Sequence, residues 1–314
     1  MEQQKKLVIY DDDDTLLTCD IKSVLVSCLS TVYTLEVTGP PKNPIECWVL
    51  SNHIKNYDGI ILVWNNLKST CSWVIDLCKR YNKEYAIVER NLLPTQQKDS
   101  FMLFSGGICF DSTNLDPKYF SAENYQENMS KIYNHYSKKS LKKLKSKKKI
   151  VFIGQLVWDS TMTHFYSAND PDNIYDEIID DYIKDNKINT DEYQIIFCPH
   201  PIIELRLKDK IKEYPVCCNL PKKYEISTKE TIKECLDAEK VVSVSSSIIY
   251  EIMGLGVDVE ILGKGKGVFP ALREWDDLNH CLSTIMDFQF NVKDDPEKIK
   301  SIINRAVLLN KGNE

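Results

Sequence analysis

The fold class of this chain can be inferred from one stretch, residues 193–201, which reads Tyr-Gln-Ile-Ile-Phe-Cys-Pro-His-Pro. Its apolar run has the length of one buried strand and stops at Pro199, because proline cannot donate a hydrogen bond to a sheet. The residue before a proline is also pushed into an extended conformation. His200 is therefore expected just past the carboxyl end of a central strand, the edge at which open α/β sheets bind ligands. A purely structural role for a single histidine is the alternative.

Strands and helices alternate on both sides of this stretch. Buried strands are expected at residues 7–10, 33–37, 60–64, 85–88, 150–153, 216–220, 240–244 and 257–262. Helices are expected at residues 21–32, 69–81, 125–136, 173–186, 205–213, 228–238, 247–255 and 295–309. Such alternation is typical of βαβ units with parallel strands. The sequence therefore predicts an α/β protein of two Rossmann-like domains that face each other across a cleft.

A lysine-rich run separates the two halves. We expect an N-terminal domain over residues 1–125, a helical and lysine-rich linker over 126–149, a C-terminal domain over 150–290 and a terminal helix over 291–314. The run from Lys138 to Lys149 contains eight lysines. Two interpretations stay open for it, a solvated linker or a contact with a polyanion such as DNA.

The composition is that of an ordinary soluble protein. The formal net charge is −6, which gives no overall attraction to nucleic acid or to an anionic membrane. No apolar run approaches the ~20 residues that span a bilayer. The eleven cysteines are scattered, and no pair has the CxxC spacing of a zinc site. We therefore expect a reduced, cytoplasmic protein without structural zinc or a membrane span.

A block of four aspartates follows the first strand. Asp11-x-Asp13-x-Thr15 resembles the opening motif of haloacid-dehalogenase-like phosphatases. In that chemistry one aspartate attacks phosphorus and the other transfers protons, with Mg²⁺ bound. The alternative is a solvated acidic turn.

Another carboxylate follows the strand at 150–153. Gly154 and Gln155 end this strand, and Asp159 lies a few residues later. A carboxylate on such a loop can serve as a nucleophile or a base. It can equally cap a loop without any catalytic role.

Small hydroxyl residues follow the strand at 240–244. Ser245, Ser246 and Ser247 lead into a helix whose first N–H groups suit a phosphate. Glu251 falls about one turn inside this helix, where it can accept hydrogen bonds from ribose hydroxyls. A serine-capped helix with one structural glutamate is the alternative.

These motifs, in this order, resemble the capsular polysaccharide synthesis family that contains the retaining β-Kdo glycosyltransferases. The similarity covers roughly residues 58–270. It rests on a strand ending in Trp64, the segment Val88-Glu89-Arg90-Asn91-Leu92-Leu93-Pro94, the segment Gly107-Ile108-Cys109-Phe110-Asp111, Gln155-x-x-x-Asp159, His200-Pro201, and Ser246-Ser247 with Glu251.

The resemblance implies a GT-B-like arrangement whose C-terminal half holds the nucleotide sugar. It implies that His200 and the turn Ser245–Ser247 bind the donor phosphate and that Glu251 positions the nucleotide. Asp159 is implied as the nucleophile of a retaining reaction with a covalent glycosyl-enzyme. Glu89 is implied as an acceptor-side base. No metal is implied.

Three positions depart from the family pattern. Cys198-Pro199 replaces a lysine before the His-Pro pair, Asn91 replaces a glycine, and residues 263–269 replace an aromatic segment. These changes lie where the donor sugar and the acceptor are expected, so the donor stays open between CMP- and UDP-linked sugars. Lys264 in the replaced segment is a candidate contact for the donor phosphates.

The leading hypothesis is a metal-independent glycosyltransferase that uses a nucleotide sugar as co-substrate and needs no other cofactor. Its acceptor is either a surface glycan or a modified DNA base. One alternative is a haloacid-dehalogenase-like phosphatase that uses Asp11 and Asp13. The other is a nucleotide-sugar-binding protein without catalytic activity.

Overall fold

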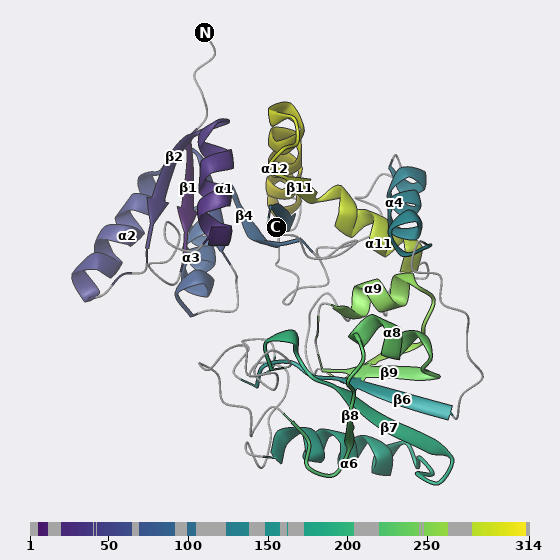
Figure 1. The fold of residues 1–314 in the computed structure, drawn as a ribbon. Coiled ribbons are helices and arrows are strands. Elements are labelled where there is room, and N and C mark those ends of the chain that lie inside the picture. The colour runs from purple at the N-terminus through teal and green to yellow at the C-terminus, as the bar shows by residue number, and fades with distance from the viewer. Residues whose placement is uncertain are drawn as a thin grey trace. The chain divides into compact units, whose positions relative to one another are not determined.

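The structure of the chain is a computed structural model. It describes residues 6–11, 20–39, 41, 43–64, 69–91, 99–104, 124–137, 148–157, 162, 173–203, 220–244, 246, 248–262 and 278–311. These residues form two compact units, each around its own sheet (Figure 1). Unit 1 takes its residues from 1–129 and 266–314, and unit 2 takes its residues from 130–265.

The sheet of unit 1 has six strands in the order β11-β5-β4-β3-β1-β2. They are β1 (Lys6–Tyr10), β2 (Thr34–Thr38), β3 (Ile60–Trp64), β4 (Tyr85–Arg90), β5 (Ser100–Phe104) and β11 (Gln289–Asn291). The strands β2, β1, β3 and β4 are parallel neighbours. β5 is antiparallel both to β4 and to β11. This sheet is therefore mixed, whereas the sequence predicted only parallel strands.

Helices cover this sheet because its central strands are apolar toward both faces. The helices of unit 1 are α1 (Asp20–Ser30), α2 (Pro44–Asn56), α3 (Ser69–Arg80), α11 (Leu278–Asp287) and α12 (Pro296–Lys311), and α4 (Tyr125–Ser137) contains the boundary between the units. Val8 and Ile61 pack in one buried cluster with Leu50 of α2 and Val74 of α3. Alternate residues of a strand point to opposite faces, and Ile9 of the other face is also fully buried.

The sheet of unit 2 has five strands in the order β10-β9-β6-β7-β8, and every described pair in it is parallel. They are β6 (Lys148–Ile153), β7 (Tyr193–Cys198), β8 (Glu225–Ile226), β9 (Lys240–Ser243) and β10 (Val259–Ile261). Figure 1 shows α6 (Ile174–Asp185) on one face and α8 (Thr231–Leu236) and α9 (Ile248–Gly254) on the other. Numbered from β6, the strand order is 3-2-1-4-5, the order of the Rossmann fold. The predicted Rossmann-like domain is confirmed for this unit.

The end of the central strand is where the sequence placed it. β7 ends at Cys198, directly before Pro199, and Phe197 is fully buried. The predicted helix at 205–213 lies outside the described residues, as does the predicted strand at 216–220 apart from Leu220.

The chain returns to the first sheet at its C-terminal end. The second domain was expected to run to residue 290, but β11 pairs with β5 and therefore belongs to unit 1. Phe290 of β11 is buried and its ring lies 5.8 Å from that of Phe101 in β5. This packing explains why the C-terminal segment belongs to the first sheet.

The last two lysines of the lysine-rich run belong to a strand of unit 2 and not to the predicted linker. Lys148 and Lys149 open β6, while residues 138–147 lie outside the described part. Lys149 is buried against Glu234 and pairs with its carboxylate, so it is not part of an exposed basic surface. Among the described helices, none is both long and apolar enough to cross a membrane. The six cysteines with described side chains are free thiols.

Candidate functional site at the carboxyl edge of the second sheet

Three neighbouring strands of unit 2 end at the same level. Ile153 at the end of β6 is opposite Cys198 of β7 on one side and Ser243 of β9 on the other. After β6 the chain continues to β7 and β8 on one side of β6, and it then crosses to β9 and β10 on the other side. The connections therefore diverge between β6 and β9. Open α/β sheets bind their ligands at this kind of divergence point. The residues that follow these three strands therefore form the candidate site.

The segment after β6 is held by a tyrosine of α6. The N–H of Gln155 donates to the hydroxyl of Tyr175 (2.5 Å), and this hydroxyl donates to the carbonyl of Gln155 (2.6 Å). The Tyr175 ring packs on that of Phe197, with 4.6 Å between the ring centroids. Gly154 donates to the carbonyl of Cys198 (2.8 Å) and ties the ends of β6 and β7 together. The backbone of Gln155 is thus fixed by two elements, and Gln155 itself is buried.

His200 follows β7 and is held by the turn that begins at Pro201. The N–H of Ile202 donates to Nδ1 of His200 (3.2 Å). Because Nδ1 accepts this bond, a neutral ring carries its proton on Nε2. The ring is half-buried. A histidine fixed in this way presents an N–H donor, the group that a phosphate oxygen requires.

The segment after β9 is tied back to its own strand. The N–H of Ser246 donates to the hydroxyl of Ser243 (3.2 Å), and Ser243 is buried. The helix α9 begins two residues later, and Glu251 lies buried in its first turn. Ser246 and Glu251 therefore lie at the same sheet edge as Gln155 and His200.

Four of the predicted site residues cannot be placed in this way. Asp159, Ser245, Ser247 and Lys264 lie outside the described residues. Four residues of the predicted donor site lie at one edge of the sheet of unit 2, namely Gln155, His200, Ser246 and Glu251. Tyr175 was not predicted, because a tyrosine on an amphipathic helix has the pattern of an ordinary core residue.

Glu89 belongs to unit 1. It lies near the carboxyl end of β4, opposite Met102 of β5, and is half-buried. The carboxyl ends of the parallel strands of this sheet also carry Asp11 and Trp64. Glu89 thus lies near the carboxyl edge of its own sheet, and its acceptor-side role stays a prediction.

Asp11 does not lie in a solvated acidic turn. Its carboxylate pairs with Nζ of Lys22 at 2.5 Å, and the two side chains are only 0% and 8% exposed. Nζ of Lys22 also lies 5.4 Å from the centre of the Trp64 ring. A carboxylate enclosed in this way cannot reach a substrate phosphate, and Asp13 lies outside the described residues. Nothing in the described part of the chain supports the phosphatase alternative.

Comparison with known proteins adds to this geometry. No protein-family model matches the chain, and no curated protein matches it. Among solved structures, the chain resembles the KpsC β-Kdo 2,4 transferase of Thermosulfurimonas dismutans with a TM-score of 0.60 and 14% identity, over 98% of this chain and 99% of that chain. It resembles the KpsC β-Kdo 2,7 transferase of the same organism with a TM-score of 0.57 and 16% identity, over 97% of this chain and 99% of that chain.

At identities this low, the TM-scores show a shared fold alone. The resemblance to the Kdo transferases of capsular polysaccharide synthesis, first drawn from short motifs, is confirmed at the level of the fold. The chain therefore has a GT-B-like fold built from two Rossmann-like units.

Proposed function

We propose that this chain is a glycosyltransferase that moves a sugar from a nucleotide-sugar donor to an acceptor. The proposal rests on one observation in unit 2. The strands β6, β7 and β9 end at the same edge of the sheet, and they are followed by Gln155, His200 and Ser246. A fully parallel sheet with this order binds nucleotides at such an edge. The GT-B-like fold agrees with this assignment.

In the proposed donor site each group has a separate task. Nε2 of His200 donates to a phosphate oxygen of the donor, and the Ser245–Ser247 turn adds hydroxyl and N–H donors. Glu251 accepts hydrogen bonds from the ribose hydroxyls. Lys264 compensates negative charge on the donor phosphate. Gln155, with its backbone held by Tyr175, orients the segment that leads to Asp159.

The proposed reaction proceeds with retention in two displacements. Asp159 attacks the anomeric carbon, the bond to the phosphate oxygen breaks, and the nucleotide leaves with the electron pair. An acceptor hydroxyl then displaces the Asp159 carboxylate while Glu89 removes the hydroxyl proton. Histidine and hydroxyl donors stabilise the leaving phosphate, so the proposed reaction needs no metal.

We propose a glycan as the acceptor rather than a DNA base. The DNA alternative relied on the lysines from 138 to 149, and two of these belong to β6. Lys149 forms a buried ion pair with Glu234, so it is not available to DNA. Nζ of Lys148 lies 5.2 Å from the centre of the Tyr193 ring. Binding to duplex DNA that falls steeply with salt would reverse this choice.

The experiment is a panel of CMP- and UDP-sugars, read by the rise in unfolding temperature and by release of free nucleotide. A productive donor is expected to stabilise the protein, since a ligand that binds only the native state raises its apparent stability. Asp159→Asn should lose nucleotide release but keep the stabilisation. The matched control is Asp191→Asn, in an exposed turn of unit 2, which should behave like the wild type.

The donor-site assignment is tested by His200→Ala. Loss of a hydrogen bond to a charged phosphate costs about 1.5–3 kcal/mol, which corresponds to roughly 10-fold to 100-fold weaker nucleotide binding. Wild-type turnover by Asp159→Asn would refute the proposed nucleophile. No stabilisation and no turnover with any sugar nucleotide would refute the proposed function.

A further inference from the structure

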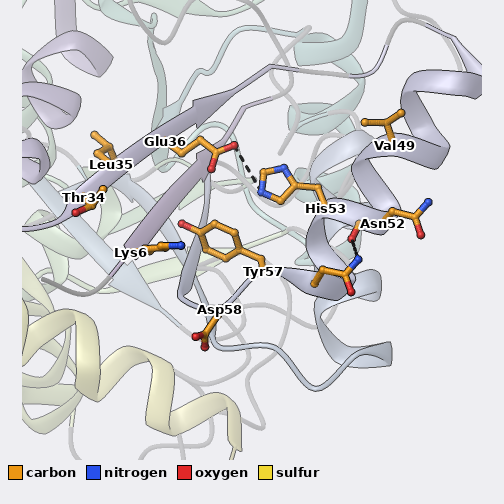
Figure 2. Close-up of a pocket in the computed structure, with 10 residues that line it drawn as sticks. Lys6, Thr34, Leu35, Glu36, Val49, Asn52, His53, Tyr57 and Asp58 are labelled. Carbon is orange, nitrogen blue, oxygen red and sulfur yellow. Dashed lines mark hydrogen bonds and ion pairs between the residues drawn. The ribbon is translucent and has the colours of Figure 1, made fainter. Parts of the chain in front are cut away.

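A groove in unit 1 lies away from the strand ends described so far. It has a volume of about 800 Å³ and lies between the edge strand β2 and the helix α2 (Figure 2). Its lining includes Lys6 and Thr34, which open β1 and β2, and Asp58, which precedes β3. Glu89 lies near the opposite, carboxyl edge of the same sheet. The volume is that of a ligand pocket, but the location is not the edge at which transfer is proposed.

Polar groups from both elements face this groove. Glu36 of β2 and His53 of α2 point toward each other, with 3.6 Å between Oε1 and Nε2 (Figure 2). Both remain accessible, since their side chains are 50% and 30% exposed. Asn52 and Asn56 lie one turn apart on α2 and add carboxamide groups. The Tyr57 ring lies 5.3 Å from that of His53 and gives the groove an aromatic wall.

A buried tyrosine, Tyr10, packs against His53. Tyr10 is 2% exposed, and its hydroxyl has no hydrogen-bond partner among the described residues. Its ring meets that of His53 edge-on at 6.5 Å. Burial, and next the charge of Glu36, raise the pKa of Tyr10, so the hydroxyl keeps its proton and remains a donor.

The charges of the groove nearly cancel. Lys6 brings one positive charge, Glu36 and Asp58 bring two negative charges, and His53 pairs with Glu36. Such a balance does not suit a phosphate or a nucleotide, which needs an excess of positive charge. The groove instead offers acceptors and donors side by side, which matches hydroxyl groups that both donate and accept.

An exposed apolar stripe continues the groove along α2. Ile45, Trp48 and Val49 are 74%, 68% and 53% exposed. Ile45, Trp48 and Val49 precede Asn52 by seven, four and three residues, so all four side chains lie on one face of the helix. Aromatic side chains such as Trp48 supply a flat apolar surface beside polar groups, which suits the C–H face of a sugar ring.

We propose that this groove is a second carbohydrate site, which binds an uncharged stretch of a glycan away from the site of transfer. The ligand class rests on the proposed function as well as on the charge balance, because a glycosyltransferase meets glycans as acceptors. Holding a long acceptor at a second point raises its effective concentration at the first.

The test is binding of the full-length chain to immobilised oligosaccharides, with neutral and acidic members compared. The double substitution Asn52→Ala/Asn56→Ala removes both carboxamides and leaves α2 intact, since alanine favours helices. The matched control is Asn304→Ala, at an exposed position of α12. We expect the wild type and the control to bind neutral oligosaccharides, and the double variant to bind at least about 10-fold more weakly.

Transfer kinetics supply a second readout. The double variant should show a higher KM for long acceptors and an unchanged KM for a monosaccharide acceptor. The proposal is overturned if no neutral oligosaccharide binds, or if the double variant binds as well as the wild type. It is also overturned if Trp48→Ser changes the association state of the protein in solution while glycan binding persists, because the stripe is then a protein interface.

The groove and the proposed function can fail separately. Glycan binding without transfer from any nucleotide sugar would refute the proposed function and support the groove. Transfer without any glycan bound at α2 would refute the groove alone.

Discussion

Gly154 follows β6 at a point where the backbone passes directly beside an aromatic ring. A Cβ atom at this position would lie 2.4 Å from Cζ of Phe197, far inside contact distance. Phe197 is fully buried and packs against Tyr175, the residue that holds Gln155. The absence of a side chain at 154 therefore determines how closely the candidate donor site is packed.

We expect Gly154→Ala to lower the free energy of unfolding by about 1–3 kcal/mol, the usual cost of overpacking a core. Because Phe197 must move, the hydrogen bonds that Tyr175 makes to Gln155 should also loosen, and nucleotides should bind more weakly. Chemical denaturation measures the first effect and nucleotide titration the second. Adding Phe197→Leu should recover part of the loss. Strict additivity of the two substitutions would contradict this explanation.

Glu234 of α8 forms a buried ion pair in unit 2. Its carboxylate pairs with Lys149, accepts from the hydroxyl of Ser227 (2.9 Å), and is 3% exposed. Burial alone would raise the pKa of Glu234, but the hydrogen bonds from Lys149 and Ser227 lower it below 4.5. The charged form is therefore the stable one in the folded protein.

Glu234→Gln leaves the Lys149 ammonium buried without a counter-charge, which should cost about 3–5 kcal/mol. A carboxyl with a lowered folded pKa stabilises the protein above its unfolded pKa, and this contribution is lost as the pH falls through the folded pKa. Below pH 4.5 the wild type should therefore lose stability more steeply than the variant. The control is Glu192→Gln, at an exposed turn position. Parallel pH profiles for wild type and Glu234→Gln would rule out this role.

At the scale of elements, α2 depends on the residue that directly precedes it. Asn43 caps the helix, and its Oδ1 accepts from the N–H groups of Ile45 (3.1 Å) and Glu46 (3.0 Å). Its Nδ2 donates back to Oε1 of Glu46 (2.7 Å), an arrangement related to the capping box. Asn43→Ala should destabilise the protein by about 1 kcal/mol, and Asn43→Ser by much less. Wild-type stability of Asn43→Ala, measured by thermal unfolding, would show that the cap contributes nothing.

The same helix shows what sequence patterns miss. α2 was not predicted, because Ile45, Trp48 and Val49 face solvent while Leu50 and Ile54 face the core. Apolar residues on two faces give no single helical stripe, so the periodicity that identifies amphipathic helices is absent. The groove beside α2 was missed for the same reason.

Strands with strong local signals were predicted well. β3 and β7 are short apolar runs with clear ends. Pro199 marked the end of β7, so the position of His200 just after this strand was predicted correctly. β11 was not predicted, because it has three residues and its partner β5 lies far earlier in the chain. The bond between Tyr175 and Gln155 likewise depends on tertiary packing and leaves no local signal.

At the scale of the whole molecule, the two units have different continuity. Unit 2 is formed by one continuous segment, whereas unit 1 needs both ends of the chain. In unit 1, β11 completes the sheet beside β5, and α12 contacts β4 and β5. The terminal helix therefore packs on the first sheet and does not belong to unit 2.

This division predicts where a nucleotide should protect the backbone from hydrogen exchange. The proposed donor site uses three segments that begin at the last residues of β6, β7 and β9, at residues 153–157, 198–203 and 243–254. A nucleotide bound across them should slow amide exchange in all three together, because opening any one of them would break contacts with the ligand. Strands of unit 1, such as β1 and β3, should exchange at the same rate with and without nucleotide.

The joint behaviour of the three segments distinguishes a shared site from local stabilisation. In His200→Ala at subsaturating nucleotide, protection should fall in all three segments, including those that do not contain the substitution. If the nucleotide bound only the turn after β9, residues 243–254 alone would be protected, and His200→Ala would leave that protection unchanged. Protection confined to β1 and β3 would instead place the nucleotide in unit 1 and contradict the assignment made from the strand order of unit 2.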